Sequence, residues 1–137
     1  MTTARDIMTS DPRCIGEQES LVDAAKLLAD LDVGALPICG EDGKLKGMLT
    51  DRDIVVKCIA SGGDPASTRA GQLAEGAPVT VDAGDDIRDA LTLMQDHQVR
   101  RLPVLDDHRL VGIISQADVA LALAPVETGE TVEEIST

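Results

Sequence analysis

The sequence of 137 residues contains no phenylalanine, tyrosine or tryptophan. Its core must therefore be built from leucine, isoleucine, valine, alanine and methionine. The aromatic side chains on which proteins stack the bases of single-stranded nucleic acids are missing too. Positive charge is scarce, since 12 Lys and Arg residues stand against 25 Asp and Glu, for a formal net charge of −13. Such a charge repels nucleic acids and anionic membranes, so neither is an expected partner.

Long apolar runs are absent as well. No stretch reaches the roughly 20 apolar residues that a membrane-spanning helix needs. Residues 1–6 lack the apolar region of a signal peptide. We therefore expect a cytoplasmic protein, and this pattern leaves non-classical export open.

Cysteine and histidine are few. The cysteines are Cys14, Cys39 and Cys58, and the histidines are His97 and His108. Because no close Cys-x-x-Cys pair occurs, a structural zinc site is not expected and no metal ligand is assigned. We expect Cys58 to be a buried small apolar residue and both histidines to lie at the surface.

An internal repeat organises the chain. Pro37 and Pro103 lie 66 residues apart, whereas Thr50 and Ser115 lie 65 residues apart. One residue is thus lost in a turn, where a deletion disturbs the fold least. We divide the chain into a first repeat at 1–61, a linker at 62–68, a second repeat at 69–124 and an acidic tail at 125–137, which is predicted to be flexible.

Each repeat is predicted to fold as β-α-β-β-α. Apolar residues recur at helical spacing from Leu21 to Leu28, directly behind Ser20, a favoured helix-capping residue. Strands are expected at 35–39 and 45–49, joined by a turn rich in Gly and Asp. The predicted fold class is α/β (α+β), with two repeats related by pseudo-twofold symmetry. A second helix is predicted at 51–60, with Ile54, Val55, Cys58 and Ile59 on one apolar face.

The clearest candidate for a ligand site is the junction between the last strand and the last helix of each repeat. Thr50 stands three residues before Asp53, and Ser115 stands three residues before Asp118. The N–H groups at a helix N-terminus favour anions, so a hydroxyl and a carboxylate there suit a phosphate and a ribose. The same spacing fits a capping box, in which these side chains satisfy the helix's own N–H groups. Recurrence of the pattern in both repeats favours a functional site.

These motifs resemble those of a tandem pair of cystathionine-β-synthase domains, known as a CBS pair or Bateman module. The resemblance rests on residues 4–8, on the segments 33–38 and 99–104 around the central prolines, and on the two junctions. It implies a non-enzymatic regulatory or sensor module. Such a module would bind AMP, ADP, ATP or S-adenosylmethionine between the repeats. It would then signal to an unknown protein partner in stress adaptation, for example in hypoxia.

The resemblance also implies roles for the junction residues. Asp53 and Asp118 match the aspartates that hold the ribose hydroxyls in this family. Thr50 and Ser115 match the hydroxyl residues that approach the phosphate. A nucleotide would thus be a reversible ligand, and no cofactor is required.

Arg100 and Arg101 distinguish the second repeat from the first. They match positions where the family carries basic residues that neutralise phosphate, and Gly34 and Ala35 occupy those positions in the first repeat. One basic cleft is therefore expected. The alternative is that the two arginines are a solvated pair near the start of a strand, paired with the aspartates at 106–107.

Two further functions remain open. The main alternative is a structural or redox-responsive dimeric stress protein that binds no nucleotide. By resemblance, apolar helix surfaces in both repeats would meet a second subunit, so a homodimer is expected. An enzyme is a distant third, because Thr50 and Ser115 have no evident His–Asp pairing and neither histidine recurs in the repeat. No catalytic residue is assigned.

Cys14 and Cys39 are candidates for a disulfide. They are expected at the start of the first strand and at the end of the second, which a β-α-β crossover makes parallel and usually adjacent. These positions would normally lie at opposite ends, but both strands are short, and their register could bring the Cα atoms within about 7 Å. Thr80 and Leu105 stand at the matching positions, so the fold itself does not demand cysteine. The alternative is two buried free thiols, which a reducing cytosol favours.

Overall fold

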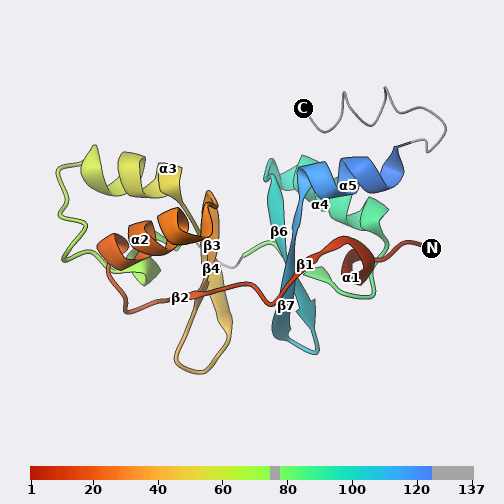
Figure 1. Cartoon of the computed structure of the whole chain (residues 1–137), viewed down its shortest axis with the longest axis horizontal. Coiled ribbons are helices and arrows are strands. Elements are labelled where there is room, and N and C mark those ends of the chain that lie inside the picture. The colour runs from red at the N-terminus through yellow and green to blue at the C-terminus, as the bar shows by residue number, and fades with distance from the viewer. Residues whose placement is uncertain (75–77, 125–137) are drawn as a thin grey trace. The chain divides into compact units, whose positions relative to one another are not determined.

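The chain forms two compact units (Figure 1). The computed structural model describes residues 1–74 and 78–124, and the predicted tail at 125–137 lies outside the described residues. One unit is the uninterrupted stretch Pro12–Pro78, which we call the continuous unit. The other combines Met1–Asp11 with the chain from Val79 onward, and we call it the split unit. No helix in the described part of the chain is long and apolar enough to cross a membrane.

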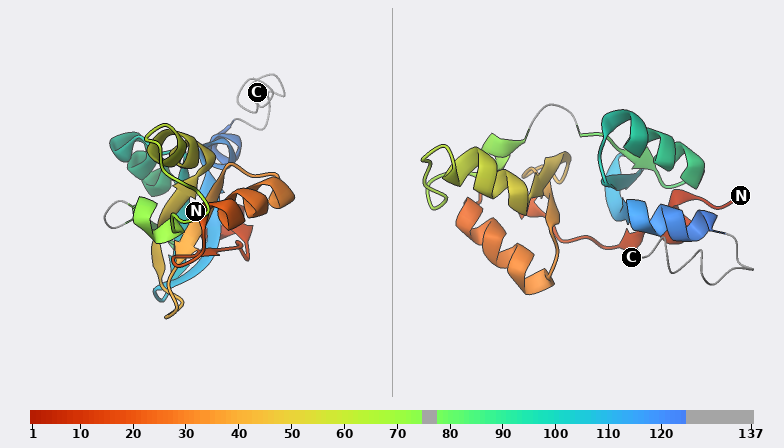
Figure 2. Two further views of the ribbon diagram at one scale, coloured as in Figure 1. Left: turned by 90° about the vertical axis from the view of Figure 1, so that its left-hand side faces the viewer. Right: turned by 90° about the horizontal axis from the view of Figure 1, so that it is seen from above.

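The continuous unit is built on a three-stranded sheet in the order β2-β3-β4. β2 pairs parallel with β3, as the predicted β-α-β crossover requires, and β3 pairs antiparallel with β4. Within this unit the helices lie on one face of the sheet (Figures 1 and 2). The elements are β2 (Ile15–Gly16), α2 (Leu21–Leu31), β3 (Ala35–Cys39), β4 (Leu45–Thr50), α3 (Asp51–Asp53), the π-helical segment η1 (Ile54–Ile59) and the 3-10 turn η2 (Ala70–Leu73).

The split unit is built on a four-stranded sheet in the order β1-β7-β6-β5. The first segment of the chain supplies β1, which runs antiparallel to β7 at the sheet edge. β5 pairs parallel with β6, and β6 pairs antiparallel with β7. The elements are α1 (Ala4–Ile7), β1 (Thr9–Ser10), β5 (Val81–Asp82), α4 (Ile87–His97), β6 (Arg101–Asp106), β7 (Arg109–Ser115) and α5 (Gln116–Leu123). The architecture is mixed α/β with two repeats, as the sequence predicts.

The long helix of each repeat begins where the sequence predicts. The Ser20 hydroxyl accepts a hydrogen bond from the N–H of Asp23 at 3.1 Å and caps α2. Asp86 caps α4 by accepting from the N–H of Arg88 at 2.9 Å. The apolar faces are buried at Leu21, Ala24 and Leu28 in α2 and at Ile87, Ala90 and Met94 in α4, whereas Ala25, which the helical spacing also places on this face of α2, is exposed.

Each compact unit is completed by a short helical turn from the other repeat. Ala4 of α1 is fully buried in the core of the split unit, and its N–H donates to the carbonyl oxygen of Asp85 at 2.9 Å. Ala70 of η2 is fully buried in the core of the continuous unit, and its N–H donates to the carbonyl oxygen of Glu19 at 2.8 Å. Repeats in the sequence and units in space therefore begin and end at different residues.

The second helix of the first repeat is only half covered. The predicted helix over 51–60 is present as α3 followed by η1, which has the wider spacing of a π-helix. Its apolar face divides, because Ile54 and Cys58 are buried whereas Val55 and Ile59 are each 54% exposed. Val56 beside them is 49% exposed. These three side chains form an exposed apolar surface, which we call the η1 surface.

Candidate ligand-binding site

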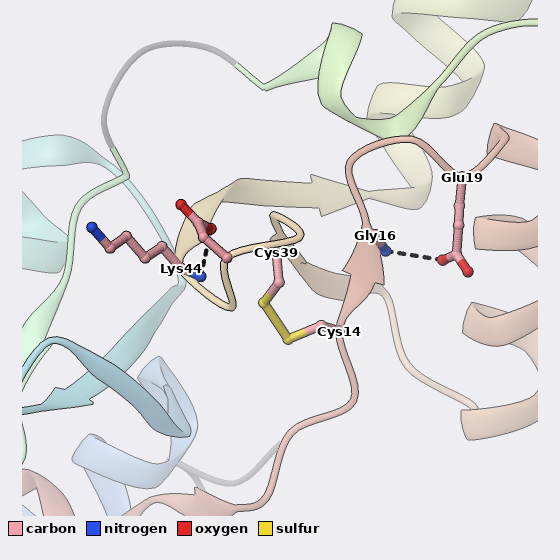
Figure 3. Close-up of a disulfide and its surroundings, with 6 residues drawn as sticks. Cys14, Gly16, Glu19, Cys39 and Lys44 are labelled. Carbon is pink, nitrogen blue, oxygen red and sulfur yellow. Dashed lines mark hydrogen bonds between the residues drawn. A yellow bond between two sulfur atoms is a disulfide. The ribbon is translucent and has the colours of Figure 1, made fainter.

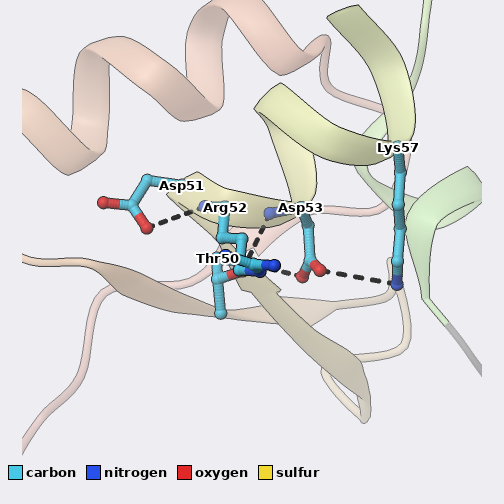
Figure 4. A network of polar contacts seen from close by, with 5 residues as sticks. All are labelled: Thr50, Asp51, Arg52, Asp53 and Lys57. Atoms are coloured by element: carbon cyan, nitrogen blue, oxygen red, sulfur yellow. Dashed lines mark hydrogen bonds and ion pairs between the residues drawn. The ribbon is translucent and has the colours of Figure 1, made fainter. Parts of the chain in front are cut away.

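The first junction is closed by its own side chains (Figure 4). β4 ends at Thr50 and α3 begins at the next residue, so strand and helix meet without a loop. The Thr50 hydroxyl accepts from the N–H of Asp53 at 3.0 Å, and the Asp53 carboxylate accepts from the N–H of Thr50 at 3.1 Å. The second oxygen of this carboxylate lies 3.4 Å from Nζ of Lys57, one helical turn further on. Both oxygens of Asp53 therefore have a partner within the protein.

The second junction repeats the capping box without the lysine. The Ser115 hydroxyl accepts from the N–H of Asp118 at 3.1 Å, and Asp118 accepts from the N–H of Ser115 at 3.0 Å. Ala122 occupies the position that matches Lys57. Within the described part of the chain, the Asp118 carboxylate accepts this one hydrogen bond only. Its other oxygen keeps its full capacity to accept hydrogen bonds.

Both junctions are thus capping boxes, which is one of the two interpretations of their sequence. A cap and a ligand site do not exclude each other, because a carboxylate has about four lone-pair positions and the cap uses one. At Asp118 the remaining capacity is open, whereas at Asp53 Lys57 takes part of it. The two copies of the motif consequently differ in what they offer a ligand.

Two arginines lie beside the second junction. Arg101 stands opposite Ser115 in the β6–β7 register, so their side chains share one face of the sheet. The carbonyl oxygen of Arg100 accepts from the N–H of Gln116 at 2.7 Å, which ties the arginine to the start of α5. Both arginine side chains are exposed, and neither forms an ion pair within residues 1–74 and 78–124. Asp106 pairs with Arg5 instead.

The first junction has the same backbone geometry but lacks the two arginines. Ala35 stands opposite Thr50, and the carbonyl oxygen of Gly34 accepts from the N–H of Asp51 at 3.1 Å. A carboxylate, that of Asp51, lies nearest to Gly34, at 3.7 Å from the position that a Cβ would take. The first junction therefore carries the carboxylates of Asp51 and Asp53. The second junction carries Asp118 together with two arginines.

Cys14 and Cys39 form a disulfide, with 5.9 Å between their Cα atoms (Figure 3). The register of β2 explains how the start of one strand meets the end of its neighbour. β2 is only two residues long and pairs with the last two residues of β3, as Ile15 with Ile38 and Gly16 with Cys39. The residue before β2 therefore lies beside the end of β3.

Cys58, the third cysteine, is free and buried, as predicted, with its Sγ 3.7 Å from the Thr68 hydroxyl. His97 and His108 are exposed, also as predicted. Within residues 1–74 and 78–124, no group of three or more His, Cys, Asp or Glu side chains is arranged to hold a metal ion.

Two features of the structure were not predicted from the sequence. One is the ion pair between Lys57 and Asp53, for which the spacing of four residues on a helix was a signal. The other is an open hollow of about 440 Å³ in the continuous unit, which contains none of the predicted site residues. It is lined by Glu17, Gln18, Ser67, Arg69, Gly71 and Gln72.

The model of the CBS domain family matches the chain twice, over residues 4–59 and 70–125. The chain therefore belongs to the CBS domain family and carries two copies of the domain. Among its curated relatives is hypoxic response protein 1 of Mycobacterium tuberculosis, which is 54% identical over 120 residues. That match covers 88% of this chain and 84% of the relative.

Two solved structures are informative neighbours. The crystal structure of hypoxic response protein I with two coordinated zinc ions has a TM-score of 0.83 and 54% identity, and the match covers 90% of this chain and all of that one. The crystal structure of CBSX2 in complex with AMP has a TM-score of 0.74 and 29% identity, with 88% and 94% of the two chains covered. The CBS-pair fold is thus shown, and one related protein binds an adenine nucleotide.

Proposed function

We propose that this protein is a non-enzymatic regulatory module that binds an adenosine-containing nucleotide at its second junction and signals to a protein partner. The observation that carries the proposal is the placement of Arg100 and Arg101 beside Ser115 and Asp118. Within the described part of the chain these two arginines form no ion pair, and their backbones lie beside the start of α5, where one oxygen of Asp118 is open. This combination suits a nucleoside phosphate, because the arginines can bind its phosphate and the carboxylate can accept hydrogen bonds from its ribose hydroxyls.

Each group has a distinct task in this proposal. The open oxygen of Asp118 accepts hydrogen bonds from the ribose hydroxyls, as a carboxylate does best when it is ionised. The guanidinium groups of Arg100 and Arg101 bind the phosphate, for which their planar array of donors is well shaped. Ser115 caps the start of α5, where the helix dipole adds a favourable field for an anion.

AMP is the first candidate among AMP, ADP, ATP and S-adenosylmethionine, because the related CBSX2 has been crystallised with it. The two CBS repeats span residues 4–125, and in this proposal the nucleotide-dependent signal passes from them to another protein. The relationship to a hypoxic response protein supports a role in stress adaptation, and we place this role in the cytoplasm.

A titration with the four ligands tests the proposal. Because the protein lacks Trp and Tyr, calorimetry or NMR must replace intrinsic fluorescence. We expect saturable binding of AMP, with amide shifts that concentrate at Ser115, Gln116 and Asp118. Absence of binding by all four ligands at millimolar concentration would refute the nucleotide function.

The η1 surface favours a second candidate, a redox-responsive dimer that binds no nucleotide. Val55, Val56 and Ile59 lie half-exposed on one helix of a chain that also contains a disulfide. A second copy of the chain would cover this surface and remove its apolar area from water. Light scattering tests this, because Ile59→Glu should convert a homodimer into a monomer whereas Lys26→Glu, an exposed change on α2, should not.

A further inference from the structure

The disulfide holds the end of β3 close to a turn that forms backbone hydrogen bonds to other parts of the continuous unit. This turn, residues 17–20, connects β2 to α2. It is linked to Cys39 in two ways: through the disulfide of Cys14, which stands before the two residues of β2, and through the N–H of Glu17, which donates to the Cys39 carbonyl oxygen at 3.0 Å. β2 itself contributes only two residues of pairing. The disulfide is therefore the strongest attachment of the turn to the sheet.

The segment that begins the second repeat is held by the same turn. The N–H of Ala70 donates to the carbonyl oxygen of Glu19 at 2.8 Å, and the N–H of Gly71 donates to that of Glu17 at 2.9 Å. A Cβ at Gly71 would lie 2.9 Å from the same Glu17 oxygen, so the two backbones are in close contact. Ser20 and Arg69 form an antiparallel bridge beside them. η2 is consequently fixed to the turn by its backbone.

We propose that the Cys14–Cys39 disulfide is a redox-controlled anchor for the turn at 17–20 and, through this turn, for the start of η2. Both cysteines are partly exposed, so a dithiol reductant can reach the bond. The reductant transfers two electrons and two protons, the Sγ–Sγ bond breaks, two thiols form, and the reductant becomes a disulfide. The turn then keeps only hydrogen bonds to the sheet, and the first residues of η2 lose a rigid support. This inference goes beyond nucleotide binding and does not depend on it.

Amide hydrogen exchange on the oxidised and reduced full-length protein tests the anchor. We expect the amides of Glu17, Ala70 and Gly71 to exchange roughly tenfold or more faster after reduction, because the covalent link that restricts local opening of the turn is then gone. The amides of Asp53, in the same unit, and of Gln116, in the other, serve as internal references and should change little. Cys14→Ser combined with Cys39→Ser should reproduce the reduced pattern without reductant.

Three results would overturn the proposal. The first is unchanged exchange at Glu17, Ala70 and Gly71, which would show that the hydrogen bonds suffice. The second is equal acceleration at Asp53, which would show a general loss of stability instead of a local release. The third is a failure of the oxidised protein to yield a linked Cys14–Cys39 peptide in mass mapping without reductant. Failure to bind AMP, in contrast, would leave all three measurements unaffected.

Discussion

Arg101 lies directly opposite Ser115 in the antiparallel pair of β6 and β7. The register of this strand pair thus places Arg101, two residues before Pro103, opposite Ser115, whose hydroxyl caps α5. The equivalent pair in the first repeat is Ala35 with Thr50, which carries no charge. The same fold therefore builds one junction with two arginines and one junction without them from two copies of one motif.

Replacing Arg101 with alanine should weaken AMP binding more than adenosine binding. Loss of a charge-assisted contact to phosphate is worth about 1.4 kcal/mol at an exposed site, or roughly tenfold in Kd. Adenosine has no phosphate, so its Kd should change less than twofold. Calorimetry with both ligands measures the contrast, with Arg109→Ala as a control that removes the same charge elsewhere on the split unit. Equal losses for AMP and adenosine would contradict a phosphate contact.

Asp118→Ala should weaken AMP binding more than Asp53→Ala. Both changes break a capping box, which costs about 1 kcal/mol of stability, so the two variants are matched in their damage to the fold. Only Asp118 has an open oxygen for a ribose beside two arginines. We expect a loss of roughly tenfold or more in affinity for Asp118→Ala, and little change for Asp53→Ala. Equal affinities in both variants and the wild type would argue against the second junction.

Lys57 should reduce the affinity of the first junction for the ribose. Its ammonium group pairs with the Asp53 oxygen that the capping box does not use. The corresponding oxygen of Asp118 is open. A partly exposed pair at this spacing is worth about 0.3–0.5 kcal/mol, so Lys57→Ala should tighten adenosine at Asp53 by about twofold. The reciprocal Ala122→Lys should weaken adenosine at Asp118 by a similar factor. NMR titration with adenosine, followed separately at the Asp53 and Asp118 amides, measures the Kd of each junction. An unchanged Kd in both variants would show that the lysine does not compete with the ribose for the carboxylate.

Gly112→Ala should destabilise the split unit. A Cβ at this buried position in β7 would collide with the Met8 side chain and lie 2.9 Å from the Thr9 carbonyl oxygen of the neighbouring β1. Overpacking against backbone costs about 1–3 kcal/mol. The matching Gly47→Ala meets the Ala74 side chain at 3.0 Å and should cost less. Urea unfolding of both variants gives the two losses, and an equal or smaller loss for Gly112→Ala would contradict the packing of β1 on β7.

Much of the fold could be predicted because its signals are local. Helical spacing behind Ser20, a Gly- and Asp-rich turn, and a hydroxyl three residues before an aspartate each span only a few residues. The structure places a capped helix, a hairpin and two capping boxes at those positions. The repeat made these signals stronger, since each feature occurred twice at matching positions. Arg100 and Arg101 were identified in the same way, as a difference between two copies.

The sequence by itself determined the two repeats, their elements and the residues at each junction. Tertiary structure alone decided that Ala4 completes the core of the split unit and Ala70 that of the continuous unit. It also decided the register of β2 on the end of β3, which places Cys14 beside Cys39. The physical reason is that capping and helical periodicity depend on neighbours along the chain. Strand register and the choice of packing partner depend on burying apolar surface contributed by residues far apart in sequence.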